Sequence, residues 1–287
     1  MNAIKVKNLK KTLGKFTLDI ENLNIKKGFI TGFIGENGAG KTTTIKLLMG
    51  MLTPDVGSIE IFNKNLTQNN IEIKESIGYV GDLCGYLKES PIKLIKKNIA
   101  PFFKNWDENF YRKYIKKFSI DENKKYMELS HGKKKQFELT MALSHHPKLL
   151  IMDEPTANLD PIIRNDFLDI LLDYMQNDEI TIFYSSHITS DLEKTCDYII
   201  FIHNGKIILN EEKELLMINH TLIKGKNELI DKETKKCFVS IKTNAFGFEG
   251  LCANKNQAFE LFGQEVIYEK PSLENIMMYY IRRNNNE

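Results

Sequence analysis

The chain has 287 residues, enough for about two domains, and its 42% apolar and 27% charged residues are the balance of a globular protein that buries its own core. Its 40 basic and 38 acidic side chains leave a net charge of only +2. A dedicated nucleic-acid binder usually carries a large positive charge, so this class of protein is a poor match. No apolar stretch approaches the roughly 18 residues that a membrane span requires, so we expect no span in this chain.

The first 65 residues alternate apolar and polar positions between turn signals, a pattern that predicts strands. Residues 90–127 instead carry apolar side chains at spacings of three and four on a Lys-rich background, which predicts a helical insert. Helix and strand alternate beyond it, which predicts a mostly parallel sheet with helices on both faces. The expected strands are 4–9, 16–20, 23–25, 29–34, 58–62, 149–152, 181–185 and 198–203, and the expected helices outside the insert are 41–51, 134–144, 162–176 and 189–195.

The pattern weakens after about residue 220, where we expect a small α+β appendage with strand-like pieces at 237–243 and 265–269 and a final helix. Ser272 is a candidate N-cap for that helix, because its hydroxyl can accept from the first free backbone N–H groups. The helix carries one apolar stripe, which we expect to pack on the chain's own C-terminal part, with pairing to another subunit as the alternative. The stripe consists of Leu273, Ile276, Met277, Tyr280 and Ile281.

Residues 35–42 read Gly-Glu-Asn-Gly-Ala-Gly-Lys-Thr, follow an apolar strand and open a helix, which is the context that a phosphate loop needs. Glycines let the backbone N–H groups turn onto phosphate oxygens. Lys41 is expected to reach the β- and γ-phosphates, and the Thr42 hydroxyl to bind Mg²⁺. The predicted phosphate-binding residues are Asn37, Gly38, Ala39, Gly40, Lys41, Thr42 and Thr43.

A second apolar strand, 149–152, runs into Asp153 and Glu154, and a buried parallel strand delivers such residues to the carboxyl edge of the sheet. Asp153 is expected to hold Mg²⁺, directly or through water, and Glu154 to act as general base on the attacking water. Alone, such a strand end is common, but an upstream phosphate loop makes it the expected second half of the site. His187 follows another apolar strand to the same edge, where it could contact the γ-phosphate, although a lone histidine is more often structural.

Residues 129–133, Leu-Ser-His-Gly-Lys, resemble the Leu-Ser-Gly-Gly-Gln signature of ABC ATPases, with His131 in place of a glycine. Residues 157–160 are similar to that family's D-loop, and residues 185–187 to its switch-histidine segment. Together with the phosphate loop and the Asp-Glu pair, these segments stand in the family's order over residues 1 to about 218.

The resemblance implies a P-loop NTPase fold of the ABC ATPase type over residues 1–218, with an antiparallel β subdomain, a helical subdomain at about 83–135, and a small accessory domain at 219–287. It also implies two ATP molecules with Mg²⁺, each held between the phosphate loop of one subunit and the signature of another. On that basis Ser130 and Gly132 would donate to the γ-phosphate from across the interface, and Asp160 of the D-loop would belong to the nucleotide site. The lysines at 133–135 would add cationic charge there, or form only a solvated surface.

Two positions depart from the family's pattern. Asp82 stands where the Q-loop glutamine is usual, and because a carboxylate can ligate Mg²⁺ but lacks an amide donor, we expect Asp82 to bind the metal and to link the nucleotide to the helical insert. Leu13 occupies the position of the usual adenine-stacking aromatic residue. Phe16 is the candidate substitute, with an ordinary core position as the alternative.

Residues 105–107, 185–193, 246–250 and 270–277 are similar to a bacterial exporter group that handles antimicrobial peptides such as bacitracin and amphipathic peptides such as phenol-soluble modulins. The resemblance implies an ATP-hydrolysing subunit at the cytoplasmic face of a bacterial membrane, attached only through a separate membrane subunit and paired with itself or with a related ATPase subunit. The alternative is a soluble ABC ATPase that regulates translation or DNA repair. Long coiled-coil insertions and a second ATPase domain, which mark that alternative group, are absent from these 287 residues.

Overall fold

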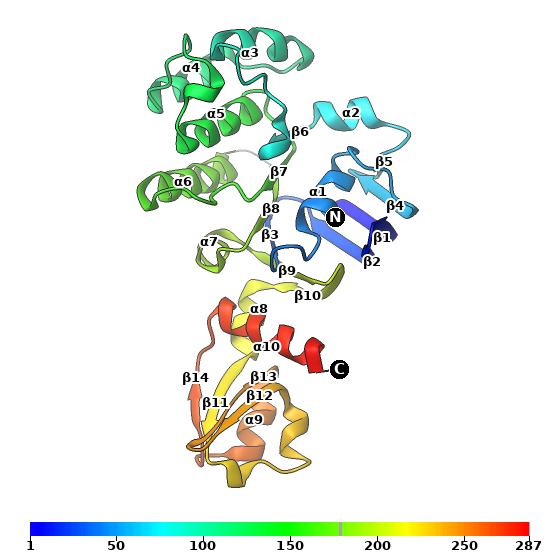
Figure 1. Ribbon diagram of the computed structural model, residues 1–287, viewed down its shortest axis with the longest axis vertical. Coiled ribbons are helices and arrows are strands. Elements are labelled where there is room, and N and C mark those ends of the chain that lie inside the picture. The colour runs from blue at the N-terminus through cyan, green and yellow to red at the C-terminus, as the bar shows by residue number, and fades with distance from the viewer. Residues whose placement is uncertain (178–179, 287) are drawn as a thin grey trace.

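The computed structural model describes residues 1–177 and 180–286 and arranges their strands in three sheets. Figure 1 shows the helical insert at one end, a six-stranded sheet in the middle and a four-stranded C-terminal sheet at the other end. Another four-stranded sheet lies beside the central one.

The central sheet has the order β10-β9-β3-β8-β7-β6, and all its neighbouring strands are parallel except the hairpin of β9 and β10. Its strands are β3 (Ile30–Ile34), β6 (Ile77–Val80), β7 (Leu149–Asp153), β8 (Thr181–Ser186), β9 (Tyr198–His203) and β10 (Lys206–Glu212). Every residue of β3 and β8 is buried, as expected for strands covered on both faces. The prediction of a mostly parallel sheet is confirmed.

The N-terminal sheet is antiparallel and has the order β2-β1-β4-β5. Its strands are β1 (Asn2–Leu13), β2 (Phe16–Lys26), β4 (Val56–Ile61) and β5 (Lys64–Asn65). The predicted break between residues 20 and 23 is wrong, because β2 continues across it and pairs Ile20 with Leu9 and Asn22 with Lys7. Asn8, with φ +48°, lies at the register irregularity between β1 and β4. This sheet and helix α1 (Lys41–Leu48) share one apolar core with the central sheet.

Helices cover the other face of the central sheet and form the insert, with a second apolar core beneath them. These are α3 (Ile92–Ile99), α4 (Glu108–Lys117), α5 (His131–Leu143), α6 (Pro161–Asn177) and α7 (Thr189–Thr195), with short 3-10 helices at Asp82–Cys84, Ala100–Phe102 and Tyr126–Glu128. Helix α2 (Asn70–Glu75) precedes β6 and was not expected. The helical insert predicted from apolar spacing is therefore present, divided between α3 and α4.

After α8 (Lys213–Asn219), the C-terminal sheet has the antiparallel order β12-β13-β11-β14. Its elements are β11 (Thr221–Gly225), β12 (Phe238–Asn244), β13 (Gly247–Cys252), α9 (Lys255–Phe262), β14 (Ile267–Glu269) and α10 (Leu273–Asn286), together with 3-10 helices at Asn227–Leu229 and Thr234–Cys237. The sequence predicted only two of the four strands. Strand β13 escaped notice because of Gly250, which is required there: a Cβ on Gly250 would come within 2.5 Å of the Phe238 ring.

Helix α10 packs on its own chain, as expected. Ser272 Oγ accepts from the backbone N–H of Asn275 at 3.1 Å, which confirms the predicted N-cap. Leu273 and Ile276 of the expected stripe are buried, and so is Tyr279, which was not expected. All three belong to the apolar core that lies beneath the helices of the central sheet. Within the described residues, no helix is both long and apolar enough to cross a membrane.

Candidate functional site

A cavity of about 430 Å³ opens over the phosphate loop at the carboxyl edge of the central sheet. Most of the predicted phosphate-binding residues line it, together with Glu154 and Phe16. The full lining is Leu13, Phe16, Glu36, Asn37, Gly38, Gly40, Lys41, Thr42, Thr43 and Glu154. A larger cavity of about 660 Å³ lies elsewhere, among residues of β4, β5, α2 and the chain's first two residues, and its lining contains none of the predicted site residues.

The backbone of the phosphate loop requires its glycines. Gly38 and Gly40 have φ values of +82° and +114°, which disfavour any side chain. A Cβ on Gly35 would come within 2.5 Å of the carbonyl oxygen of Ile202, so the loop lies directly against β9. The methyl group of Ala39 is buried in the apolar core, so this residue contributes only its backbone to the loop.

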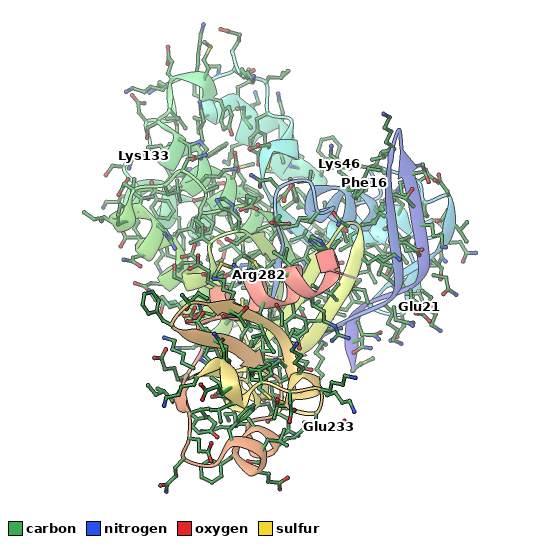
Figure 2. All side chains as sticks on the ribbon, turned by 60° about the horizontal axis from the view of Figure 1, so that its bottom comes forward. Phe16, Glu21, Lys46, Lys133, Glu233 and Arg282 are labelled. Atoms are coloured by element: carbon green, nitrogen blue, oxygen red, sulfur yellow. The ribbon has the colours of Figure 1, made fainter. Side chains whose placement is uncertain are left out.

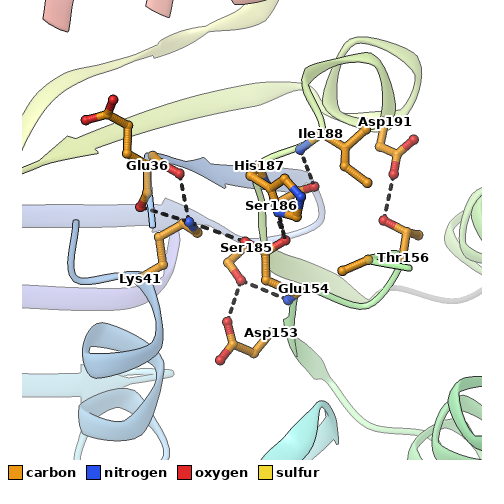
Figure 3. Close-up of polar contacts among 12 residues, drawn as sticks. Glu36, Lys41, Asp153, Glu154, Thr156, Ser185, Ser186, His187, Ile188 and Asp191 are labelled. Atoms are coloured by element: carbon orange, nitrogen blue, oxygen red, sulfur yellow. Dashed lines mark hydrogen bonds and ion pairs between the residues drawn. The ribbon is translucent and has the colours of Figure 1, made fainter. Parts of the chain in front are cut away.

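Lys41 is buried in the loop, with 6% of its side chain exposed. Its Nζ donates to the carbonyl oxygens of Gly35 at 2.7 Å and Glu36 at 3.2 Å, and lies 3.3 Å from Oε1 of Glu154 (Figure 3). The ammonium is thus surrounded by oxygen atoms at the place where the sequence predicts phosphate oxygens.

One hydroxyl group hydrogen-bonds to both acidic residues at the end of β7, to the carboxylate of Asp153 and to the backbone of Glu154. Ser185 Oγ donates to Oδ1 of Asp153 at 2.6 Å and accepts from the backbone N–H of Glu154 at 3.0 Å (Figure 3). Glu154 has φ +47°, so the chain turns sharply there and directs the side chain toward the loop. This role of Ser185 was not expected, and the available signal was its position at the end of a strand beside β7.

His187 lies against the second oxygen of Glu154. Its Nδ1 is 2.8 Å from Oε2, and its backbone N–H donates to the same oxygen at 3.2 Å. Because an ionised carboxylate only accepts, Nδ1 carries the hydrogen and Nε2 remains available to a ligand. Glu154 therefore joins Lys41 through one oxygen and His187 through the other.

A buried ion pair supports the segments around these groups. Asp191, which is 2% exposed, accepts from Thr156 Oγ1 at 2.6 Å and from Nε of Arg164 at 2.6 Å. Arg164 also donates to Ser190 Oγ at 2.8 Å. The cluster joins Thr156, two residues after Glu154, to helices α6 and α7, and no sequence pattern indicates it.

Asp82 lies two residues after the end of β6, the strand beside β7. A Cβ on the preceding Gly81 would come within 3.2 Å of the Cβ of Asp153, so the two strand ends are in contact. Oδ1 of Asp82 lies 3.4 Å from Nζ of Lys135 on α5. Burial alone would lower the pKa of Lys135, but the carboxylates of Glu138 and Asp82 raise it above its usual value. The alternative that residues 133–135 form only a solvated surface is therefore wrong for Lys135, which is 3% exposed.

Phe16 is half-buried at the rim of the cavity. A Cβ on Gly40 would come within 3.1 Å of its Cζ, so the ring lies on the phosphate loop. It also packs against the core shared by the two sheets. Phe16 therefore lines the cavity and also contacts the core, and its stacking on an adenine stays a prediction.

The signature segment lies apart from this cavity and caps a helix. Ser130 Oγ accepts from the backbone N–H of Lys133 at 3.3 Å at the start of α5, and a Cβ on Gly132 would meet Ile163 at 2.8 Å. Figure 2 shows Lys133 on a different part of the molecule from Phe16. None of residues 129–133 lines the described cavity.

Asp160 is likewise absent from the cavity lining. Its Oδ1 accepts from the backbone N–H groups of Ile162 at 3.1 Å and Ile163 at 3.0 Å, so Asp160 is the N-cap of α6. The exposed His131, at the position of the expected glycine, places Nε2 3.1 Å from the carbonyl oxygen of Ala157. The signature segment and the segment 157–160 are therefore in contact within one chain.

Comparison with known proteins identifies the family. The sequence model of ABC transporters matches residues 18–157. The bacitracin transport ATP-binding protein BcrA of Bacillus licheniformis is 37% identical over 211 residues, which are 71% of this chain and 68% of that protein. This chain belongs to the ABC transporter family. The lantibiotic transport ATP-binding protein SrtF of Streptococcus pyogenes is 33% identical over 226 residues, 73% of this chain and 90% of the relative.

Solved structures agree with this assignment. The ADP conformation of an ATP-binding cassette of an ABC transporter is 28% identical, with a TM-score of 0.62 over 75% of this chain and 92% of that one. The expected P-loop NTPase fold of the ABC ATPase type is confirmed. The chain is an ATP-binding and ATP-hydrolysing subunit of a transporter, and the alternative of a soluble regulator of translation or DNA repair is not favoured.

Proposed function

We propose that this ABC ATPase drives export of an amphipathic or antimicrobial peptide through a separate membrane subunit, by closing around ATP and opening after hydrolysis. The proposed hydrolysis of ATP rests on the contacts of Glu154. One carboxylate oxygen lies 3.3 Å from Nζ of Lys41, and the other lies 2.8 Å from Nδ1 of His187. In this arrangement the general base is paired with the phosphate-binding lysine until a nucleotide enters. Phosphate oxygens would then replace Glu154 as the partner of Lys41, which would leave the Glu154 carboxylate free to accept a proton from the attacking water.

The phosphate groups would be bound by the loop and the start of α1. The proposed ligands are Asn37, Gly38, Gly40, Lys41, Thr42 and Thr43, with the backbone of Ala39, and Phe16 would stack on the base. Loop N–H groups and the N-terminus of α1 favour negative charge. His187 holds Glu154 through its Nδ1–H group and would present Nε2 to the γ-phosphate.

The proposed metal ligands are Thr42, Asp153 and Asp82. A hydroxyl and two carboxylates form the hard oxygen set that Mg²⁺ prefers, and the contact of Gly81 with Asp153 brings the two carboxylate-bearing strand ends together. When bound with ATP, the metal would neutralise phosphate charge. Ser185 would hold Asp153 in place for it, because its hydroxyl already donates to Oδ1.

We propose that a second copy of the chain, or a related ATPase subunit, completes each nucleotide site. The cavity is open, and the cap of α5, with Ser130 and Gly132, lies away from it within one chain. The free N–H groups at the start of this 13-residue helix would bind the γ-phosphate of the partner's nucleotide. Asp160 would act at the same interface by fixing the start of α6.

The proposed division is an ATPase domain at 1–218, with its helical subdomain at about 83–135, and an accessory domain at 219–287. The exposed apolar side chains of the helical subdomain include Leu87 at 69%, Leu94 at 41% and Phe102 at 76%. We propose this surface as the docking site of the membrane subunit, which would hold the protein at the cytoplasmic face of the membrane. Two relatives are named as ATP-binding proteins of bacitracin transport and of lantibiotic transport, and these names support a peptide as the cargo.

Replacing the general base tests the catalytic part. Glu154→Gln is expected to bind ATP but to lose at least about 100-fold in hydrolysis rate, the usual contribution of a general base. The variant should also accumulate as an ATP-bound dimer in size-exclusion chromatography. Glu260→Gln, on the exposed face of α9, is the matched control. A fully active Glu154→Gln variant contradicts the assignment.

The cargo is tested in the complex with the membrane subunit reconstituted in vesicles. A cationic amphipathic peptide such as a lantibiotic is expected to stimulate ATP hydrolysis, and a scrambled, non-amphipathic peptide of the same composition is the control. Equal rates with both peptides would contradict a peptide cargo and leave the ATPase assignment standing.

A further inference from the structure

Lys135 is a buried cation that the proposed chemistry does not use. It lies on α5, and only 4% of its side chain is exposed. Its Nζ is 3.1 Å from Oε2 of Glu138, which is equally buried, and 3.4 Å from Oδ1 of Asp82, whose side chain is 97% exposed. Tyr126 donates to the other oxygen of Glu138 at 2.5 Å.

The two carboxylates around Lys135 are not equivalent. Separating Lys135 from Glu138 would leave two buried charges without partners, which is strongly unfavourable. Asp82 is surrounded by water, and an exposed ion pair of this kind shifts an equilibrium by about fivefold at most. Asp82 can therefore leave Lys135 at little cost, while Glu138 keeps the lysine paired.

Asp82 also stands between two parts of the molecule. On one side, the preceding Gly81 contacts Asp153 at the proposed metal site. On the other side, the chain that follows is attached to the helical insert, because the Tyr86 ring packs with its centroid 5.5 Å from those of both Tyr126 and Phe137. A movement of Asp82 between metal and lysine would therefore be transmitted to α5 and the insert.

We propose that Lys135 is a positioning residue for Asp82. It retains the Asp82 carboxylate against α5 while the nucleotide site is free, and it releases this carboxylate to Mg²⁺ when Mg·ATP binds. Lys135 thus competes with the metal for one ligand, and the helix that begins at Ser130 responds to the occupancy of the chain's own nucleotide site. The inference rests on the proposed role of Asp82 as a metal ligand.

The test compares the affinity of the full chain for a fluorescent, non-hydrolysable ATP analogue in Mg²⁺ and in EDTA. The ratio of the two affinities should rise about two- to fivefold in Lys135→Met/Glu138→Gln, which removes both buried charges together. The same double substitution should leave the ratio unchanged when Asp82→Asn is also present. Lys134→Met, one residue away on the same helix, is the matched control, and Lys135→Arg should keep the unmodified ratio.

A ratio that does not rise, or that rises equally in the presence of Asp82→Asn, overturns the proposal. If Asp82→Asn alone leaves the ratio unchanged, Asp82 is not a metal ligand and the premise of the proposal fails. If the unmodified chain does not bind the ATP analogue at all, the proposed function itself is contradicted.

Cys84 provides a second measurement that does not depend on the folding of the double variant. Asp82 and Cys84 belong to the same 3-10 turn, so a shift of Asp82 displaces the half-buried Cys84 thiol. In the unmodified chain, the alkylation rate of Cys84, followed by mass spectrometry of its peptide, should change at least about twofold between the analogue with Mg²⁺ and the analogue in EDTA, because burial controls access to a thiol. The change should vanish in Asp82→Asn, and a rate that is the same in both conditions in the unmodified chain overturns the proposal.

Discussion

Replacing Arg164 with methionine should separate a buried ion pair while keeping the apolar stem of the side chain. Asp191, with 3% of its side chain exposed, would lose the arginine and, among the described residues, retain only Thr156 as a hydrogen-bond donor to its carboxylate. Breaking a buried pair by removing one partner costs about 3–5 kcal/mol, because the remaining charge is left unpaired. Since 25% of the Arg164 side chain is exposed and water can reach its place, we expect about 3 kcal/mol, the lower end of that range.

A loss of this size should lower the midpoint of thermal unfolding by roughly 6–12 °C, measured by circular dichroism. Arg112→Met is the matched control, because Arg112 forms an exposed ion pair with Glu108 on α4 and should cost well under about 1 kcal/mol. The double variant Arg164→Met/Asp191→Asn should recover most of the loss, since the amide of the new side chain needs no counterion. Equal midpoints for Arg164→Met and Arg112→Met would show that the buried pair does not contribute this stability.

Two further predictions concern the phosphate loop and the response to acid. Gly35→Ala should abolish binding of a fluorescent ATP analogue, because the new Cβ would come within 2.5 Å of the Ile202 carbonyl oxygen; an affinity within about threefold of the unmodified chain would contradict this. Burial lowers the pKa of His145 to about 4 from the 6.5 of the unfolded chain, so protonation favours unfolding and stability should fall by roughly 3 kcal/mol as the pH drops from about 6.5 to 4. His145→Phe, which keeps the stacking on Phe103, should remove this part of the pH dependence in urea unfolding, and identical slopes for both chains would count against it.

The parts of the site that the sequence predicted are those built from local context. The phosphate loop needs only a strand, a glycine-rich turn and a helix in succession, and Glu154 and His187 each follow a buried strand directly. Strands of one parallel sheet end at one edge, so their terminal residues meet there without further information. The contacts of Glu154 with Lys41 and His187 fulfil this expectation.

The parts that the sequence did not reveal depend on burial and on partners far along the chain. Every residue of α5 from Lys135 to Leu143 is buried, so polar residues such as Glu138 lie inside the protein and the sequence shows no amphipathic pattern there. The partner of Lys135 outside α5 is Asp82, 53 residues away, and no local signal joins the two.

The C-terminal sheet was underestimated for a related reason. Strand β13 contains Gly247 and Gly250, which weaken any strand pattern, and its glycines are explained only by what packs on them. The Phe238 ring covers Gly250, and the backbone of Gly225 lies against Gly247. Such close approaches are properties of the folded sheet rather than of the segment.

In the proposed dimer, one nucleotide is held between the phosphate loop of one copy and the signature segment of another. We would measure inter-chain cross-linking by a short bismaleimide between one tagged chain carrying Asn37→Cys and a second, differently tagged chain carrying His131→Cys. We expect a cross-linked product containing both tags, formed only with Mg²⁺ and a non-hydrolysable ATP analogue and absent when either cysteine is omitted. Absence of that product under conditions in which the two chains co-purify as a nucleotide-bound dimer would contradict it.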